Sequence, residues 1–448
     1  MAARLAGRAG LLVTGAAEIA TFAGGLRRGA GQDDPALAPA GSAIACLDGR
    51  ILAVAAEAEA RDALVGALEA AGAAPDAFDR LDASGATVTP GLIDSHTHLL
   101  FGGSREREIA LRQRGASYLE ILAAGGGILS TVAATRAASD AALLAHGRRW
   151  LAEMRRQGTT TVEAKSGYGL DVATELRLVA AAARLAAEGP VDVLPTFLGA
   201  HAVPAEVRAA HPGDPAAAAE AYVRSVITDQ LPAIAAQGLA RFADVFCETG
   251  VFTPDQARRV LLAAREFGLG LRLHADELAP SGGAELAVEL RACSADHLGS
   301  PSAAGLAALA DAAAAGRPVV ATLLPTVGWF LGLAPTEPAR DLIASGVPVA
   351  IATDFNPGTS PVAGLPLAMT AAALTLRLTP TECLVATTVN AAAALCLADR
   401  GVLAPGLRAD LVIWDVPTHV QIPYWAGAGL VRAVITGGRS TPESGGDT

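Results

Sequence analysis

The sequence lacks the features of several protein classes. Its 448 residues carry a formal net charge of −11, and no basic patch or arginine-rich run indicates a nucleic-acid partner. No run of about 20 strongly apolar residues is free of charge, so we expect no membrane-spanning helix. The first residues are interrupted by Arg8 and Glu18 and make a poor signal peptide. These absences predict a protein that binds neither nucleic acid nor membrane.

Cysteine is sparse and irregularly placed. The five cysteines are odd in number and show no CxxC spacing, which argues against a disulfide framework or a cysteine-based zinc site. We expect them to be small buried hydrophobic residues in a protein of the reducing cytoplasm. They are Cys46, Cys247, Cys293, Cys383 and Cys396.

Lysine is almost absent. Lys165 is the only lysine, and the other long basic side chains are arginines. A position that remains lysine in such a chain can require a compact ammonium rather than a guanidinium. The other interpretation is that one surface lysine has survived by chance.

A repeated pattern runs through most of the chain. Each repeat has a β-branched apolar run, a polar residue at its end, and then an Ala/Leu/Arg-rich helical stretch. Eight such repeats predict an α/β fold with a parallel (β/α)₈ barrel over residues 88–400. The apolar runs are residues 87–99, 158–169, 191–202, 241–250, 270–277, 291–298, 318–327 and 347–358.

One predicted helix illustrates the local signals. Residues 253–268 have Thr253 as an N-cap, Pro254 at the first helical position and Gly268 as a stop. The two flanks, 1–87 and 401–448, contain short strand-like pieces instead. Neither is long enough for a β-domain of its own, so we expect them to combine into one small β-sandwich beside the barrel.

Polar side chains collect at the ends of the predicted strands. In a (β/α)₈ barrel the C-terminal strand ends face one shared pocket, and five of the eight histidines are found there. This concentration predicts a functional site, whereas His146, His211 and His419 are expected to be structural or exposed. The strand-end residues are His96, His98, Lys165, Tyr168, His201, Glu248, His274, Glu277, His297 and Asp354.

A metal site is the chemistry that these residues favour. His96 and His98 are two residues apart on a strand, so their imidazoles share one face. With His274 and Asp354 they form a set of three nitrogen ligands and one oxygen ligand. Such a set suits zinc or ferrous iron and leaves room for a water molecule.

Several motifs make the sequence similar to the amidohydrolase superfamily and, within it, to the imidazolonepropionase family. The matching stretches extend from about residue 40 to the C-terminal part of the chain. They include TPGLIDSHTHLLFGGSRERE, GASYLEIL, VEAKSGYGL, HADEL, SADHL, ATDFNPGTSP and IPYWAG. The resemblance implies a homodimeric hydrolase that opens the cyclic amide of a small molecule, 4-imidazolone-5-propanoate, to N-formimidoyl-L-glutamate.

The resemblance also implies roles for particular residues. One divalent metal, zinc or alternatively iron, would be held by His96, His98, His274 and Asp354. Asp354 would take a proton from the attacking water, with His297 sharing that role or holding the oxyanion, and Glu277 would pass a proton to the leaving nitrogen. Substrate contacts would come from Arg105, Tyr168, His201, Glu277, Asn356, Gly358 and Thr359.

The first of these substrate contacts has a simple physical basis. Arg105 follows the Gly102–Gly103 turn, so its guanidinium could bind the propionate carboxylate in a bidentate manner. The rest of the run SRERE, including Arg107 and Glu108, is better interpreted as solvated charge.

The resemblance favours a single metal ion. Binuclear relatives bridge two metals with a lysine at the end of the fourth strand, where this chain has Cys247 and Glu248. Lys165 then becomes an electrostatic group near the metal ligands or an anionic substrate.

Two alternatives remain open at this stage. One is a mononuclear deaminase of a nucleobase or formimino compound, and the other is a catalytically inactive barrel. The second normally lacks metal ligands, all four of which are present here.

Overall fold

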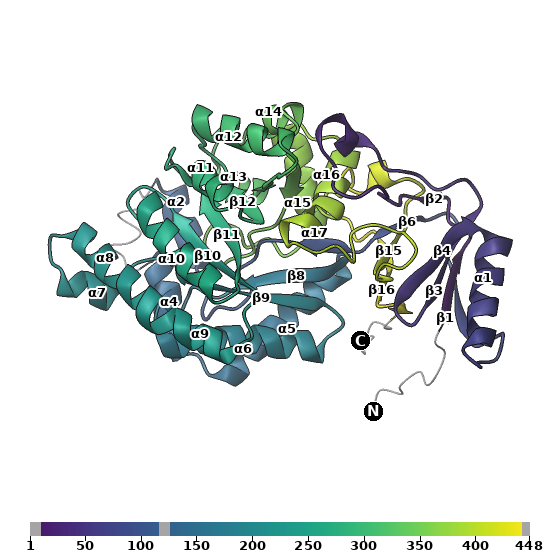
Figure 1. Ribbon diagram of the computed structural model, residues 1–448, viewed down its shortest axis with the longest axis horizontal. Coiled ribbons are helices and arrows are strands. Elements are labelled where there is room, and N and C mark those ends of the chain that lie inside the picture. The colour runs from purple at the N-terminus through teal and green to yellow at the C-terminus, as the bar shows by residue number, and fades with distance from the viewer. Residues whose placement is uncertain (1–9, 116–125, 441–448) are drawn as a thin grey trace.

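The computed structural model describes residues 10–115 and 126–440, and its centre is an eight-stranded parallel sheet surrounded by helices (Figure 1). The strands follow one another around the sheet in chain order. A backbone bridge between Thr97 and Phe355 joins the first strand to the last. The predicted (β/α)₈ barrel is therefore confirmed. Its strands are β7 (Leu92–Asp94), β8 (Thr159–Lys165), β9 (Asp192–Ala200), β10 (Phe242–Cys247), β11 (Gly270–Ala275), β12 (Ser294–His297), β13 (Val320–Leu323) and β14 (Val349–Ile351).

Helices cover the outside of the barrel (Figure 1). The predicted helix at residues 253–268 is α10, in which the Thr253 hydroxyl and the Gln256 side chain form a reciprocal capping box. Gly268, with φ +80°, follows its end. The helices after β7 are α2 (Glu106–Gln113), α4 (Ile128–Ala137), α5 (Asp140–Arg156), α6 (Val172–Glu188), α7 (Ala205–Ala210), α8 (Pro215–Ser225), α9 (Leu231–Gln237), α10 (Pro254–Glu266), α11 (Gly283–Glu289), α12 (Ala303–Ala314), α13 (Pro325–Leu331), α14 (Ala339–Ala344), α15 (Leu365–Ala371), α16 (Pro380–Ala386) and α17 (Val389–Ala394).

The flanks form two small sheets that pack on each other. One sheet, in the order β4-β3-β1-β5, uses the N-terminal flank alone, and the other, β17-β16-β15-β6-β2, combines both ends of the chain. Apolar side chains such as Ile44 and Ile413 form the core between them. The predicted β-sandwich is thus present, with one helix, α1 (Glu57–Ala70), that the sequence analysis did not anticipate. Its strands are β1 (Gly10–Thr14), β2 (Glu18–Ile19), β3 (Ser42–Leu47), β4 (Arg50–Ala56), β5 (Phe78–Asp82), β6 (Thr87–Pro90), β15 (Leu411–Trp414), β16 (Val431–Thr436) and β17 (Arg439–Ser440).

The domain limits at residues 87/88 and 400/401 stay predictions. Strand β6 straddles the first limit and pairs with β15 in the flanking sheet, whereas the barrel sheet begins at Leu92. The motif GASYLEIL lies almost entirely in residues 116–125, outside the described residues.

No single helix in the described ranges is long and apolar enough to cross a membrane. Helices α4 and α5 reach such a length and composition only together, with a 119° bend between them.

The expectation of unpaired cysteines is wrong for one pair. Cys293 and Cys396 form a disulfide across a sequence separation of 103 residues. Cys293 immediately precedes β12 and Cys396 follows α17, and the barrel packing brings these two ends together. Nothing in the spacing indicated this contact. The other three cysteines are buried and unpaired, as predicted.

His146 on α5 is structural, in agreement with the sequence analysis. Its ring packs edge-on against Phe101, with 4.2 Å between ring centroids. Burial, with a smaller contribution from the charge of Arg149, lowers the pKa of His146 to about 4. An unfolded histidine binds its proton near pH 6.5. Acidification from about pH 6.5 to about pH 4 therefore protonates the unfolded chain first, and the folded protein loses stability over that interval.

We expect His146→Phe to flatten this part of the stability profile, because phenylalanine keeps the ring packing and cannot bind a proton. Denaturant titrations at several pH values would measure the free energy of unfolding. His211→Gln, at the C-terminal end of α7, is the control and should leave the slope unchanged. An unchanged slope in His146→Phe would contradict the assignment.

Candidate metal-dependent active site

The seam that closes the barrel also assembles the site. The Asp354 amide donates a hydrogen bond to the His96 carbonyl (3.0 Å), and the His98 amide donates to the Phe355 carbonyl (2.9 Å). The His-x-His segment after β7 and the aspartate after β14 are thereby held against each other. The sequence analysis expected these residues to meet, and the backbone pairing supplies the reason.

Backbone strain accompanies this junction. Asp354 has φ 49° and His297 has φ 75°, both in the left-handed region that non-glycine residues rarely adopt. Below the seam, the buried Asp94 carboxylate accepts hydrogen bonds from the Thr353 amide (3.0 Å) and hydroxyl (2.6 Å). These bonds hold the start of the strained turn in place.

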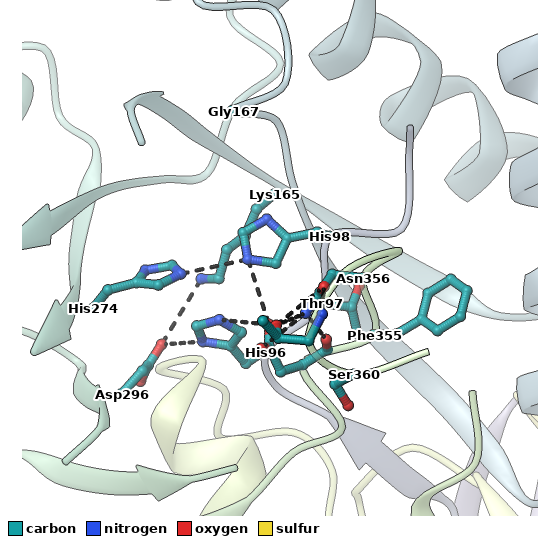
Figure 2. Close-up of polar contacts among 12 residues, drawn as sticks. His96, Thr97, His98, Lys165, Gly167, His274, Asp296, Phe355, Asn356 and Ser360 are labelled. Carbon is teal, nitrogen blue, oxygen red and sulfur yellow. Dashed lines mark hydrogen bonds and ion pairs between the residues drawn. The ribbon is translucent and has the colours of Figure 1, made fainter. Parts of the chain in front are cut away.

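Four potential ligand atoms lie near the seam, and Figure 2 shows the rings of His96, His98 and His274 turned toward one another. Asp354 Oδ1 lies 3.5 Å from His96 Nε2 and 3.5 Å from His98 Nε2. His274 Nε2 lies 3.4 Å from His98 Nε2. Ligands about 2.1 Å from a tetrahedral metal are separated from one another by roughly 3.4 Å. These three separations match those expected between ligands of one metal ion.

The protonation chemistry of the ligands agrees with this fit. Burial, followed by nearby positive charge, lowers the pKa of His96 and His98 well below the usual value. Both imidazoles are therefore neutral, and each can offer a nitrogen lone pair to a metal ion. His96 Nε2 and Asp354 Oδ1 are buried and make no hydrogen bond. Buried polar atoms without partners are costly, and a cation between them would satisfy both.

Two further histidines border the same space. His201 groups with His98 and His274, and His297 groups with His96 and His274, in each case with nitrogen atoms within 4.8 Å. His201 Nδ1 is already bonded to the Gly167 carbonyl at 2.9 Å. Burial is the main cause that lowers the pKa of His201 to about 3, so this ring is neutral as well.

Two of the three candidate histidine ligands are oriented by carboxylates that were not predicted from the sequence. His96 Nδ1 lies 2.7 Å from Asp296 Oδ2, and His274 Nδ1 lies 2.9 Å from Asp244 Oδ2. Such partners fix the tautomer and the ring orientation of metal-binding histidines. Asp244 and Asp296 could have been found from the sequence, because each is a charged residue inside an apolar strand and such residues are rarely buried without a partner.

Lys165 contacts the carboxylates that orient the histidines and does not line the cavity. Its Nζ lies 2.8 Å from Glu163 Oε1 and 2.7 Å from Asp244 Oδ2, and the side chain is fully buried. Burial alone would lower the pKa of the ammonium, but Asp244 and Glu163 raise it above the ordinary value. The interpretation of Lys165 as a surviving surface lysine is therefore wrong.

A cavity of about 440 Å³ opens above the ligands. Its size suits a small polar molecule. Two of the predicted site residues, His96 and Gly358, do not line it. The predicted residues that do are His98, Arg105, Tyr168, His201, His274, Glu277, His297, Asp354, Asn356 and Thr359.

Arg105 is held in place at the cavity wall by Glu108. Its Nε and Nη2 donate to the two Glu108 oxygens at 2.8 and 2.9 Å. Glu108 is buried, so its interpretation as solvated charge is wrong. Arg105 Nη1 lies against Gly358, where a Cβ atom would be only 2.0 Å away. The missing side chain at Gly358 thus makes room for the guanidinium.

The DFNPGTS turn is internally bonded. Asn356 Oδ1 accepts from the amides of Gly358 and Thr359, both at 2.8 Å. Asn356 Nδ2 donates to Asp354 Oδ2 at 3.0 Å. The Gly358 amide, expected to contact substrate, is thus engaged inside the turn, and Asn356 orients the carboxylate of Asp354.

Glu277 and His297 face the cavity from neighbouring strand ends. Glu277 Oε2 is 3.6 Å from His297 Nδ1. Burial raises the pKa of Glu277 to about 7, against an opposing contribution from His274. A carboxyl group with such a pKa can both accept and donate a proton near neutral pH.

Glu248, the strand-end residue of β10, accepts hydrogen bonds from the Leu278 amide and the Ser281 hydroxyl.

Two cavity-lining arginines were not anticipated. Arg112 donates to the Gly358 carbonyl at 3.1 Å and to Glu108 Oε2 at 3.0 Å. Arg208, at the rim, donates to the Val203 carbonyl at 3.0 Å. Both lie on helices that follow the strands, so they could not be found among the residues at the strand ends.

The fold and the site define a metal-dependent hydrolase of the amidohydrolase class. The model of the amidohydrolase family matches residues 87–441, and the chain belongs to this family. Solved structures with the same fold include a triazine hydrolase variant (TM-score 0.68, 17% identity, 96% of this chain and 94% of that chain). A 5-methylcytosine deaminase from Klebsiella pneumoniae is similar in fold (TM-score 0.67, 18% identity, 96% and 97%).

The sequence relatives are more specific. A protein from Symbiobacterium thermophilum named imidazolonepropionase is 47% identical over 97% of this chain and 98% of its own length. A protein of the same name from Geobacillus kaustophilus is 50% identical over 82% of this chain and 83% of its own length.

We expect Gly358→Ala to weaken substrate binding without unfolding the protein. The new methyl group would push the Arg105 guanidinium aside, and Gly358 does not need a positive φ. Loss of a hydrogen bond to a charged group corresponds to an increase in KM of about 10- to 100-fold. Steady-state kinetics and thermal unfolding measure the two effects.

Gly429→Ala is the matched control, because nothing lies within 4 Å of the added Cβ atom. It should leave both KM and the melting temperature unchanged. A normal KM in Gly358→Ala would show that the position of Arg105 does not matter for binding.

Proposed function

We propose that this chain is an imidazolonepropionase, which hydrolyses the cyclic amide of 4-imidazolone-5-propanoate to N-formimidoyl-L-glutamate. The observation that carries the proposal is the approach of Asp354 Oδ1 to His96 and His98, and of His98 to His274, under a cavity with arginines at its wall. The close relatives of the same name support it over nearly the full chain.

The metal and the substrate anchors follow from the geometry. His96, His98, His274 and Asp354 would hold one divalent ion, zinc or alternatively iron. When bound, this ion lowers the pKa of a water molecule and polarises the amide carbonyl. Arg105 would bind the propionate through Nη1, the atom not used by Glu108. The remaining substrate contacts would come from Tyr168, His201, Glu277, Asn356 and Thr359.

Proton transfer is assigned to three residues at the cavity floor. Asp354, oriented by Asn356 Nδ2, accepts the proton of the attacking water. His297, whose ring nitrogen lies within 4.8 Å of those of His96 and His274, steadies the carbonyl oxygen as charge develops there. Glu277 delivers a proton to the ring nitrogen as the C–N bond breaks, so that the products are a carboxylate and a neutral amidine nitrogen.

The deaminase alternative makes a different product. It would release ammonia from a nucleobase or formimino compound, whereas ring opening of the imidazolone releases none. Homodimerisation rests on the family resemblance and a cytoplasmic location on the sparse cysteines, and both are kept as proposals.

The function is tested by following loss of the imidazolone ultraviolet absorbance, with ammonia and metal measured on the same sample. We expect turnover without ammonia and one equivalent of metal per chain. Ammonia release, or turnover of a nucleobase in place of the imidazolone, would favour the deaminase.

Asp354→Asn and His274→Ala should each abolish turnover, because each removes a ligand, and Asp354→Asn also removes the proton acceptor. Thr370→Ser, far from the ligands on α15, is a conservative control that should retain activity. A variant of either ligand with near-normal activity would rule out the assigned site.

Glu277→Gln should lower kcat by about 100- to 10,000-fold, the usual contribution of a general acid–base group. Glutamine has nearly the same volume but cannot transfer the proton, so metal content should stay at the level of the unmodified protein. A small change in kcat would assign proton delivery to another group.

A further inference from the structure

Lys165 has no part in the proposed reaction, although it is the only lysine in the sequence. Its side chain is buried, and its ammonium faces Asp296 (Figure 2). Nζ is 2.7 Å from Asp244 Oδ2, 2.8 Å from Glu163 Oε1 and 3.8 Å from Asp296 Oδ2. One cation therefore faces three carboxylates from three different strands.

Two of these carboxylates orient histidine ligands. Asp244 Oδ2, which contacts Lys165, is also the partner of His274 Nδ1, and Asp244 Oδ1 accepts from the His274 amide at 3.1 Å. Asp296 Oδ2 is the partner of His96 Nδ1. A displacement of either carboxylate would rotate the imidazole bonded to it.

The third carboxylate reaches the backbone between the paired histidines. Glu163 Oε2 accepts from the Thr97 amide at 3.3 Å. The Lys165 amide itself donates to the Thr97 carbonyl at 3.0 Å. Thr97 lies between His96 and His98, so the segment that carries both ligands is bonded to Lys165 and to its partner.

The formal charges of the side chains around this lysine can be counted. Glu163, Asp244 and Asp296 face two cations, Lys165 and Arg272, which leaves one net negative charge. Together with Asp354 this matches the charge of a divalent ion. Arg272 Nη2 bonds Asp296 at 2.8 Å. Within the described residues, Lys165 is the only ammonium or guanidinium within 4.0 Å of Asp244.

We propose that Lys165 is a positioning residue whose ammonium holds Asp244, Glu163 and Asp296 in the arrangement that fixes the three histidine ligands. Its effect should appear in metal retention and in kcat, and not in KM, because the side chain does not line the cavity. The kcat readout rests on the proposed function, whereas metal retention requires no substrate.

The test compares metal release from the holoenzyme to an excess of chelator. In Lys165→Met we expect release to be faster and kcat to be lower, each by about 10-fold, the lower end of the effect of losing a direct partner of a metal ligand, because Lys165 acts through Asp244 and Asp296. KM should stay within about twofold of the normal value. Equal release rates, or a change in KM alone, would overturn the proposal.

Arg400→Met is the matched control for the loss of a buried ion pair. Arg400 Nη1 bonds Asp192 Oδ2 at 2.6 Å at the start of β9, the opposite end of the barrel. Both variants should lower the melting temperature, but only Lys165→Met should speed metal release. Equal acceleration in both would reduce Lys165 to a general stabilising role and overturn the proposal.

Glu163→Gln provides a second measurement if Lys165→Met does not fold. It removes one charge beside Lys165 without touching a histidine side chain, so we expect a smaller acceleration of metal release. A normal release rate would overturn the proposal. Faster release in a protein that does not turn over the imidazolone would support the positioning role while rejecting the proposed function.

Discussion

The pairing of the first barrel strand with the last is the constraint on which the site depends. The two backbone hydrogen bonds between the His96–His98 segment and the Asp354–Phe355 segment close the sheet and hold the paired histidines against Asp354. Asp94 and Thr353, 259 residues apart in sequence, reinforce the closure from below. A shift of this seam would alter the fold and the metal site together, which explains why strained backbone is tolerated at Asp354.

Below the seam the barrel interior is charged, in contrast to the usual apolar filling of such a barrel. Buried charges are costly unless they are paired and hydrogen-bonded. Here the carboxylates of Asp244 and Asp296 each bond a histidine ligand on one side and a cation on the other. The interior thus forms a polar support, and the cavity wall above it carries Arg105, which we propose as the anchor of a small anionic substrate.

The barrel and the residues at its strand ends were predictable because strand periodicity and strand-end position are local properties. The partners of those residues were not. Glu108 looks like surface charge in the run SRERE, and only the packing of α2 shows it buried against Arg105. Cys293 and Cys396 gave no spacing signal, since their contact depends on how α17 meets β12. Gly358 was expected to contact substrate, but its lack of a side chain is what the packing of Arg105 requires.

The sequence by itself determined the repeating strand–helix order, the His-x-His pair on one face, and the presence of a single lysine. Each of these follows from local spacing and composition. The tertiary structure alone decided that this lysine is buried among carboxylates and that the Arg105 guanidinium is bonded to Glu108. It also decided that Asp354 Oδ1 lies 3.5 Å from His96 Nε2 and from His98 Nε2, and that His98 Nε2 lies 3.4 Å from His274 Nε2. Those facts depend on the closure of the barrel, which brings together side chains from strands far apart in the chain.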